Sequence, residues 1–212
     1  MTEEQTDRAA RLALKKRLGR TWGAFFERHG NFTPVQVAAI PCLLEGQNAV
    51  ICAPTASGKT EAALVPLIER HCQHIFGESA SELRILYITP TRALVNDLLG
   101  RLATPLATLH VSFASKTHDL TTFNPRSPAQ ILITTPEAID SLLTAHAQLF
   151  ANLRAMIIDE LHLFDGTPRG DQLRVLIRRI QQIRTYAAGK NDAPDDNLQM
   201  VALSATLGEP YR

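Results

Sequence analysis

A phosphate-binding loop is the first chemistry that the sequence offers, at residues 53–62, which read APTASGKTEA. The general pattern for such a loop is G-x-x-x-x-G-K-[ST], and Ala53 stands where its first glycine is usual. In this pattern Gly58 lets the backbone approach a phosphate closely, Lys59 reaches the terminal phosphates, and the Thr60 hydroxyl holds Mg²⁺. The stretch therefore favours a nucleotide site, with a turn of small residues as the alternative.

An acidic pair ends a later apolar run, where Asp159 and Glu160 stand in IIDELH. A carboxylate at such a position can bind Mg²⁺, directly or through water. The neighbouring Glu160 could orient the attacking water and remove its proton. The alternative is a helix cap with an incidental acidic neighbour. Because the chain also carries a Gly-Lys-Thr loop, the metal interpretation is favoured.

Two weaker signals lie outside these motifs. Gln36, in FTPVQ at 32–36, has a planar amide whose donor and acceptor match the edge of adenine. The alternative is a surface glutamine that follows a turn. The tripeptide SAT at 204–206 carries hydroxyls that could bridge the acidic pair to another element, which is weak support by itself.

Two Thr-Pro segments precede predicted helices, TPTRALVND at 89–97 and TTPEAID at 134–140. Helix N-termini at these places would offer N–H groups to backbone phosphates of a nucleic acid. Arg92 could add a charge-assisted contact. Ordinary helix capping is the alternative.

Short apolar runs alternate with helical patterns and must position these clusters. Strands are predicted at 48–54, 83–90, 110–115, 129–136, 153–160 and 199–206. Helices are predicted at 2–20, 58–76, 91–106, 137–145 and 169–188, and a polar loop at 188–198. This alternation predicts an α/β fold whose mainly parallel sheet is covered by helices and binds ligands beyond the carboxyl ends of its strands. The clusters around Lys59, Arg92, Asp159 and Ser204 all fall at such ends.

The N-terminal segment is predicted to be an amphipathic helix that packs on the core. Its apolar positions are Leu12, Leu14 and Leu18. The aromatic residues that follow, Trp22, Phe25 and Phe26, are predicted to dock this helix rather than to bind a ligand.

The composition places few limits on function. The 212 residues suit one fairly large domain, and 45% hydrophobic with 20% charged residues is ordinary for a globular protein. A net charge of +1 neither supports nor excludes nucleic-acid binding. The three cysteines, Cys42, Cys52 and Cys72, form no C-x-x-C pair, which fits buried, inert thiols in a reducing cytoplasm. The sequence has no signal-peptide pattern and no apolar run of spanning length, so no membrane partner is expected.

Taken in order, the motifs resemble those of superfamily-2 helicases. FTPVQ, APTASGKTEA, PTRALVND, TPEAID, DELH and SAT resemble the Q motif and motifs I, Ia, Ib/Ic, II and III, from about residue 30 to residue 207. Alanine is usual at the position of Ala53 in this superfamily. DELH resembles the DExH enzymes, and residues 161–180 resemble the segment of Lhr-type and Ski-like helicases in which a Gly-x-x-Arg-Gly turn precedes a helix.

The resemblance implies a role for each motif residue. Gln36 would read adenine, and the loop would hold the phosphates through Thr55, Ala56, Ser57, Gly58, Lys59, Thr60 and Glu61. Lys59, Asp159 and Glu160 would be catalytic, with Thr60 and Asp159 on Mg²⁺. Coupling of hydrolysis to strand separation would use His162, Ser204 and Thr206. The nucleic-acid backbone would be held by Thr91, Arg92, Thr135, Pro136 and Glu137.

The implied fold is an α/β, RecA-like P-loop NTPase domain at 30–212, preceded by a helical extension at 1–29. A second RecA-like domain with an arginine finger is typical of these helicases and is not found in this sequence, so we expect weak ATP binding and slow hydrolysis by the chain alone. The implied function is an ATP-dependent nucleic-acid helicase or translocase in the cytoplasm. It would use ATP and Mg²⁺ on single-stranded or duplex nucleic acid, with DNA slightly favoured over RNA, together with that second domain. The alternatives are a P-loop ATPase motor that acts on protein and a non-enzymatic scaffold with a helicase-like fold.

Overall fold

The computed structural model describes residues 3–77, 82–117, 121–191 and 198–205. Its strands form one six-stranded sheet in the order β1-β6-β5-β2-β4-β3, and every pair of neighbours is parallel. This confirms the predicted sheet, and each predicted strand is present. The strands are β1 (Ala49–Cys52), β2 (Ile85–Ile88), β3 (Phe113–Lys116), β4 (Ile131–Thr134), β5 (Ala155–Ile158) and β6 (Gln199–Ser204).

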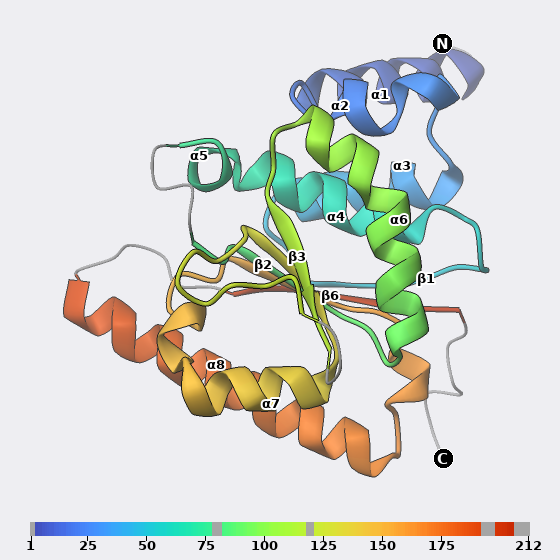
Figure 1. The fold of residues 1–212 in the computed structure, drawn as a ribbon. Coiled ribbons are helices and arrows are strands. Elements are labelled where there is room, and N and C mark those ends of the chain that lie inside the picture. The colour runs from blue at the N-terminus through green and yellow to red at the C-terminus, as the bar shows by residue number, and fades with distance from the viewer. Residues whose placement is uncertain (1–2, 78–81, 118–120, 192–197, 206–212) are drawn as a thin grey trace.

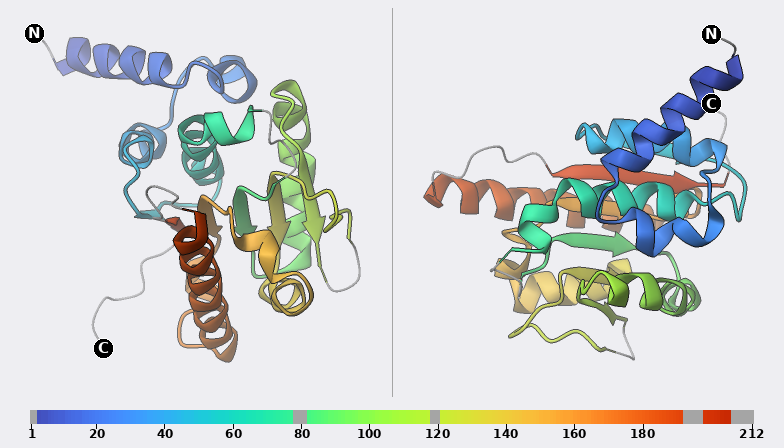
Figure 2. Two further views of the ribbon diagram at one scale, coloured as in Figure 1. Left: turned by 90° about the vertical axis from the view of Figure 1, so that its left-hand side faces the viewer. Right: turned by 90° about the horizontal axis from the view of Figure 1, so that it is seen from above.

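Helices cover both faces of the sheet (Figure 1). One layer contains α3, α4 and α6, with α1 and α2 outside it, and the other contains α7 and α8; Figure 2 shows the same layers from two other sides. The α-helices are α1 (Glu3–Arg17), α2 (Trp22–Phe25), α3 (Pro34–Leu44), α4 (Lys59–Arg70), α5 (Cys72–Ile75), α6 (Arg92–Thr108), α7 (Pro136–Ala145) and α8 (Pro168–Asn191). Short 3₁₀ helices are η1 (Glu27–His29), η2 (Ala147–Phe150) and η3 (Leu161–Leu163).

The sheet separates two hydrophobic cores, because successive side chains of a strand point to opposite faces. In β2, Ile85 and Tyr87 belong to the core beneath α3, α4 and α6, whereas Leu86 and Ile88 belong to the core above α7 and α8. All four side chains are fully buried, as expected for a strand in the middle of a doubly covered parallel sheet. The apolar runs read from the sequence therefore correspond to strands that are buried on both sides.

The aromatic residues after α1 dock the N-terminal helices, as predicted. The ring centroids of Trp22 and Phe26 are 5.6 Å apart, and Phe32 lies 4.9 Å from Trp22 and 5.0 Å from Phe26. Leu14 and Leu18 are buried in the same core, but Leu12 is 56% exposed, so its predicted core position is wrong. Its place on the helix points it away from the neighbours that cover the other two leucines.

Some predicted boundaries are also wrong. The helix predicted at 58–76 is divided at His71, whose backbone (φ −95°, ψ 21°) leaves the helical region between α4 and α5. The strand predicted from residue 110 begins at Phe113, because His110 has a positive φ of 56°. Helix α8 continues to Asn191, and residues 192–197 of the predicted loop lie outside the described residues.

Two further properties of the described part concern its cysteines and its helices. The thiols of Cys42, Cys52 and Cys72 are free and only partly buried, which corrects the prediction of buried thiols. No helix in this part of the chain is both long enough and apolar enough to cross a bilayer.

A capping box formed by Thr33 and Gln36 stabilises the start of α3. The Thr33 hydroxyl accepts from Gln36 N at 3.4 Å, and Gln36 Oε1 accepts from Thr33 N at 2.9 Å. We expect Thr33→Ala to lower the free energy of unfolding by about 1 kcal/mol, because it removes an N-cap. Urea denaturation measures this, with Thr144→Ala on the exposed face of α7 as the matched control. Equal losses in the two variants would contradict a capping effect.

Candidate functional site

The carboxyl ends of the parallel strands meet at one edge of the sheet, where a cavity of about 760 Å³ opens. Lys59 and Thr60 of α4 line it together with Asp159 and Glu160, which follow β5. The predicted convergence of Lys59 and Asp159 is therefore confirmed. Of the residues predicted to contact a nucleotide, Gln36, Thr55, Ala56, Gly58, Lys59, Thr60 and Glu61 line this cavity and Ser57 does not.

The loop after β1 is shaped by residues in the left-handed backbone region. Ala56 and Gly58 have φ values of 61° and 86°. The φ of Gly58 strains any residue that has a side chain, and a Cβ there would also force the Gln36 amide to shift. The Lys59 ammonium donates hydrogen bonds to the carbonyl oxygens of Ala53 and Pro54, the latter at 2.8 Å. These bonds hold the lysine side chain inside its own loop, at the wall of the cavity.

Gln36 lies at the side of the cavity, with a relative exposure of 5%. Its Nε2 donates to the Gly58 carbonyl at 3.3 Å, while its Oε1 belongs to the capping box with Thr33. The interpretation of a surface glutamine is therefore wrong. The amide joins α3 to the phosphate-loop region, and its role towards adenine stays a prediction.

Both oxygens of the Asp159 carboxylate are held. Oδ1 accepts from Glu160 N at 2.9 Å, and Oδ2 accepts from the Tyr87 hydroxyl at 2.9 Å. Burial raises the pKa of Asp159, and the hydrogen bonds from Tyr87 and the Glu160 backbone oppose this rise. Asp159 is 8% exposed, so its charge is costly unless it is used or compensated.

Glu160 has an unusual backbone for a residue with a side chain, with φ 47° and ψ 49°. Strain of this kind persists only where the surrounding structure enforces it, often at functional sites. Glu160 precedes η3, but its side chain makes no capping hydrogen bond, so the helix-cap interpretation is wrong for this residue. Among the described residues, its buried Oε2 has no hydrogen-bond partner.

His162 and Ser204, which are predicted to couple hydrolysis to strand separation, do not line the 760 Å³ cavity. His162 Nδ1 is 3.2 Å from Ser204 Oγ and 3.4 Å from Glu160 Oε2. The carbonyl of Ser204 also accepts from Ala53 N at 3.2 Å. The end of β6 is thus joined to the acidic pair through His162 and to the phosphate loop through the backbone. Thr206 lies outside the described residues.

The residues predicted to hold nucleic acid follow β2 and β4, which are neighbours in the sheet. Thr91 caps α6 by accepting from Leu94 N at 3.3 Å, so the capping alternative holds there, and Arg92 is exposed. None of these residues lines the 760 Å³ cavity. They form a separate group at the same edge of the sheet.

The residues predicted to hold nucleic acid at the start of α7 make other contacts than those at the start of α6. Thr135 precedes the helix without a side-chain cap, and Pro136 occupies its first turn. Glu137 pairs with Arg169 of α8, whose Nε and Nη2 lie 2.8 and 2.7 Å from its Oε1. This carboxylate therefore connects the start of α7 to the segment of α8 that resembles Lhr-type helicases.

Tyr87, which bonds Asp159, and Arg101, which lines the cavity, are among the residues near the site that were not predicted. Tyr87 had no signal beyond being the one residue with a hydroxyl among the four of β2. Arg101 of α6 lines the cavity and pairs with Glu61 at 3.1 Å and Asp97 at 3.4 Å. Arg101 could not be found from spacing, since its partner Glu61 is far away in the sequence.

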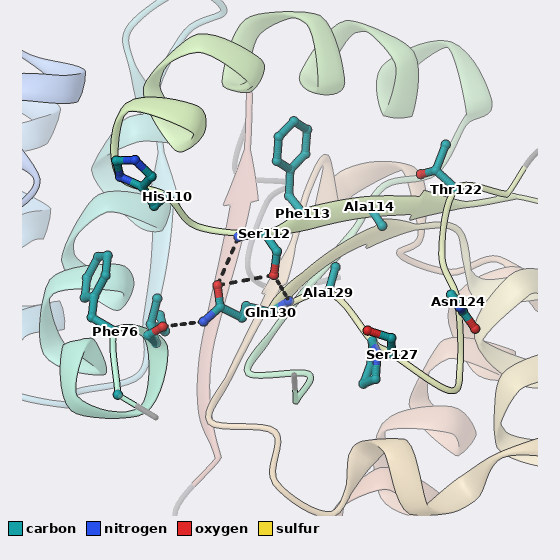
Figure 3. A pocket seen from close by; sticks show the side chains of 13 residues that line it. Phe76, His110, Ser112, Phe113, Ala114, Thr122, Asn124, Ser127, Ala129 and Gln130 are labelled. Atoms are coloured by element: carbon teal, nitrogen blue, oxygen red, sulfur yellow. Dashed lines mark hydrogen bonds between the residues drawn. The ribbon is translucent and has the colours of Figure 1, made fainter. Parts of the chain in front are cut away.

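A second cavity of about 500 Å³ lies at the amino-terminal ends of β3 and β4 (Figure 3). Gln130 Oε1 accepts from Ser112 N at 3.0 Å and from Ser112 Oγ at 3.3 Å, and its Nε2 donates to the Ile75 carbonyl. Both polar atoms of this amide are therefore occupied by the protein. The network joins α5 to the sheet and explains why a polar residue is buried there.

The parallel sheet, the left-handed loop and the convergence of lysine with the acidic pair define a RecA-like P-loop domain. Residues 33–212 match the profile of the DEAD/DEAH box helicases, and the chain belongs to this family.

The relatives confirm the resemblance to Lhr-type helicases. The chain is 32% identical over 197 residues to the Lhr helicase/probable uracil glycosylase of Mycolicibacterium smegmatis, covering 84% of this chain and 12% of that protein. It is 30% identical over 198 residues to the ATP-dependent helicase Lhr-Core of Sulfolobus acidocaldarius, covering 86% of this chain and 22% of that protein. The chain thus spans less than a quarter of the length of either curated relative.

A solved structure agrees in fold. The chain is similar to the Mycobacterium smegmatis helicase Lhr bound to ssDNA and AMP-PNP, with a TM-score of 0.74 and 29% identity. The match covers 90% of this chain and 25% of that chain.

Proposed function

We propose that this chain is the ATP-binding domain of an ATP-dependent nucleic-acid helicase or translocase. The observation that carries the proposal is the cavity at the carboxyl edge of the sheet, where Lys59, Thr60, Asp159 and Glu160 converge in a member of the DEAD/DEAH box family. The relative bound to ssDNA and AMP-PNP supports both ligands. The cavity and the predicted nucleic-acid residues occupy the same edge of the sheet, as coupling between the two ligands requires.

The residues at the site fit ATP with Mg²⁺. Gly58 turns the loop into the N-terminus of α4, where free N–H groups can bind a phosphate, and the buried Oε2 of Glu160 at the cavity has no hydrogen-bond partner among the described residues. Thr60 and Asp159 would hold Mg²⁺, which when bound neutralises charge on the phosphates. The described residues contain no group of three or more His, Cys, Asp or Glu that could hold a metal. That agrees with Mg²⁺, because such sites use one or two carboxylates and are completed by water and phosphate oxygens.

In this proposal each side chain has a defined task. Lys59 exchanges its hydrogen bonds with the loop carbonyls for bonds to the terminal phosphate. Glu160 accepts a proton from the attacking water at its carboxylate. His162, 3.4 Å from that carboxylate, connects the change to Ser204 and β6. Gln36, already held at the cavity by Thr33 and Gly58, contacts the adenine.

The partners in this proposal are nucleic acid and further protein. The N-termini of α6 and α7 contact backbone phosphates, with Thr91, Arg92, Thr135 and Pro136 at the contact and Glu137 orienting Arg169. DNA is favoured over RNA because the relative of known structure was bound to ssDNA. A second RecA-like domain of the longer protein supplies the arginine finger. We place the protein in the cytoplasm, which suits its free thiols.

The test is binding of a fluorescent single-stranded DNA oligonucleotide at several salt concentrations, in the presence of AMP-PNP and Mg²⁺. We expect the affinity to fall steeply with salt, since phosphate contacts release counterions. Arg92→Ala should weaken binding about three- to tenfold and reduce the salt slope by about 1. Arg126→Ala, an exposed arginine in the loop between β3 and β4, is the matched control.

The same binding experiment distinguishes a nucleic-acid helicase from a P-loop ATPase that acts on protein. Nucleotide binding without any oligonucleotide binding would favour a P-loop ATPase that acts on protein. An RNA oligonucleotide of the same sequence tests the preference for DNA.

A further inference from the structure

Tyr87 places a hydroxyl in the interior of the sheet. It is fully buried in the middle of β2, within the core that lies beneath α4 and α6. A buried hydroxyl costs free energy unless it is hydrogen-bonded, and phenylalanine would fill the same space without that cost. The hydroxyl therefore calls for an explanation in terms of its partners.

Those partners are two residues of the candidate site. The Tyr87 hydroxyl donates to Asp159 Oδ2 at 2.9 Å. Burial raises the pKa of Tyr87 well above its usual value and the Asp159 charge raises it further, while a side-chain hydrogen bond with Thr60 acts in the opposite direction. The phenol thus lies between Thr60 of α4 and Asp159 after β5, and its hydroxyl is the donor to the Asp159 carboxylate.

The sheet register explains how the contact is made. Tyr87 is paired with Ile157 on the neighbouring strand, two residues before Asp159. Residues 157 and 159 are about 6.6 Å apart along an extended chain, which is close to the reach of a tyrosine side chain. The ring therefore runs beneath α4 towards the carboxyl edge, and its end fixes an oxygen that the Glu160 backbone does not hold.

We propose that Tyr87 is a positioning residue for Mg²⁺-dependent nucleotide binding, whose hydroxyl orients the Asp159 carboxylate towards a metal ion shared with Thr60. The inference rests on the proposed function, because it assumes that Asp159 serves Mg²⁺. In Tyr87→Phe the carboxylate keeps the bond to Oδ1 but loses the donor to Oδ2. The carboxylate is then held by one hydrogen bond and rotates more easily. Part of the free energy of Mg²⁺ binding is used to order it, so the affinity for Mg²⁺ falls.

The experiment separates metal-dependent from metal-independent binding. A fluorescent ATP analogue is titrated into the chain in EDTA, and then at rising Mg²⁺ concentrations. For Tyr87→Phe we expect an unchanged affinity in EDTA and an approximately tenfold higher Mg²⁺ concentration for half of the metal-induced gain, the size of effect of one hydrogen bond to a charged group. Tyr186→Phe, the same chemical change on the exposed surface of α8, should match the wild type in both conditions.

A purely structural role would give a different result. Equal losses of affinity with and without Mg²⁺, or no change in either, would overturn the proposal. Thermal denaturation followed by circular dichroism establishes that Tyr87→Phe is folded at the temperature of the titrations.

The double variant separates this inference from the proposed function. In Asp159→Asn the Mg²⁺-induced gain should be lost, and adding Tyr87→Phe should change nothing further, because the two residues act through one contact. A normal Mg²⁺ response in Asp159→Asn would overturn the assignment of Asp159 to the metal itself. A lost response in Asp159→Asn beside a normal response in Tyr87→Phe would overturn only the role of Tyr87.

Discussion

Replacing Lys59 with alanine lowers the affinity of the chain for ATP about 10- to 100-fold. The ammonium group is the cation of the loop, and its hydrogen bonds to a phosphate are charge-assisted, each worth about 1.5–3 kcal/mol. At ~1.4 kcal/mol per tenfold change, the net loss of one such bond gives this range. Isothermal titration calorimetry with ATP and Mg²⁺ measures the effect directly.

The control for this variant is Lys16→Ala on the exposed side of α1, which removes the same charge far from the cavity. Its affinity for ATP should equal that of the wild type. Lys59 also bonds the carbonyls of Ala53 and Pro54, so circular dichroism of Lys59→Ala establishes that the fold is retained. An unchanged affinity in a folded Lys59→Ala variant would leave the loop as a turn of small residues and favour the non-enzymatic scaffold.

Lowering the pH from 6.5 to about 4 removes about 3 kcal/mol of folding free energy through His71 alone. Burial, and after it the charges of Arg70, His74, Arg154 and Arg184, together lower the pKa of His71 from 6.5 to about 4. Its Nε2 is buried without a hydrogen-bond partner among the described residues, so a proton there gains no compensating bond.

The direction of the pH effect on stability follows from the protons that His71 binds in the folded and in the unfolded chain. Between pH 6.5 and about 4 the unfolded chain binds a proton at this histidine and the folded chain does not, so stability falls as pH falls. Above pH 6.5 both states are neutral at His71 and the contribution is complete. The size follows from ~1.4 kcal/mol for each pKa unit between the two states.

Urea denaturation of the wild type and of His71→Gln at pH 7.5 and pH 4.5 measures this contribution. The difference in unfolding free energy between the two proteins should change with pH in favour of the variant at low pH, because glutamine cannot be protonated. Carboxylates titrate in both proteins and cancel in the comparison. His29→Gln, at an exposed position, should follow the wild type at both pH values, and identical pH dependence in His71→Gln would contradict the prediction.

The strands could be predicted because their signal is local. Runs such as LRILYITP and LRAMIIDE are apolar at every position, which is the pattern of a strand that is buried on both faces. The ends of these runs placed Lys59 and Asp159 at one edge before any contact between them was known, since parallel strands share a direction. The order of the strands in the sheet was not predicted, because it depends on packing between segments that are distant in sequence.

The wrong predictions concern positions at which local geometry or a contact departs from the pattern read in the sequence. Leu12 lies two residues before Leu14, so it points to a different side of α1 from Leu14 and Leu18 and is 56% exposed. The periodicity of 58–76 continues across His71, although the backbone there leaves the helix. The assignment of Glu61 and Glu137 to ligands stays a prediction. In the structure each carboxylate is bonded to an arginine of another helix, Arg101 or Arg169.

The sequence by itself determined the α/β class, the parallel sheet, the edge at which the site lies and nine of the twenty residues that line its cavity. These properties depend on local patterns and on the common direction of parallel strands. Only the tertiary structure decided which atoms support the site, namely the Gln36 amide against Gly58, His162 between Glu160 and Ser204, and the Tyr87 hydroxyl on Asp159. The contacts of Gln36 with Gly58, of His162 with Ser204 and of Tyr87 with Asp159 join residues far apart in the chain, and such a contact leaves no periodicity or spacing from which it could be predicted.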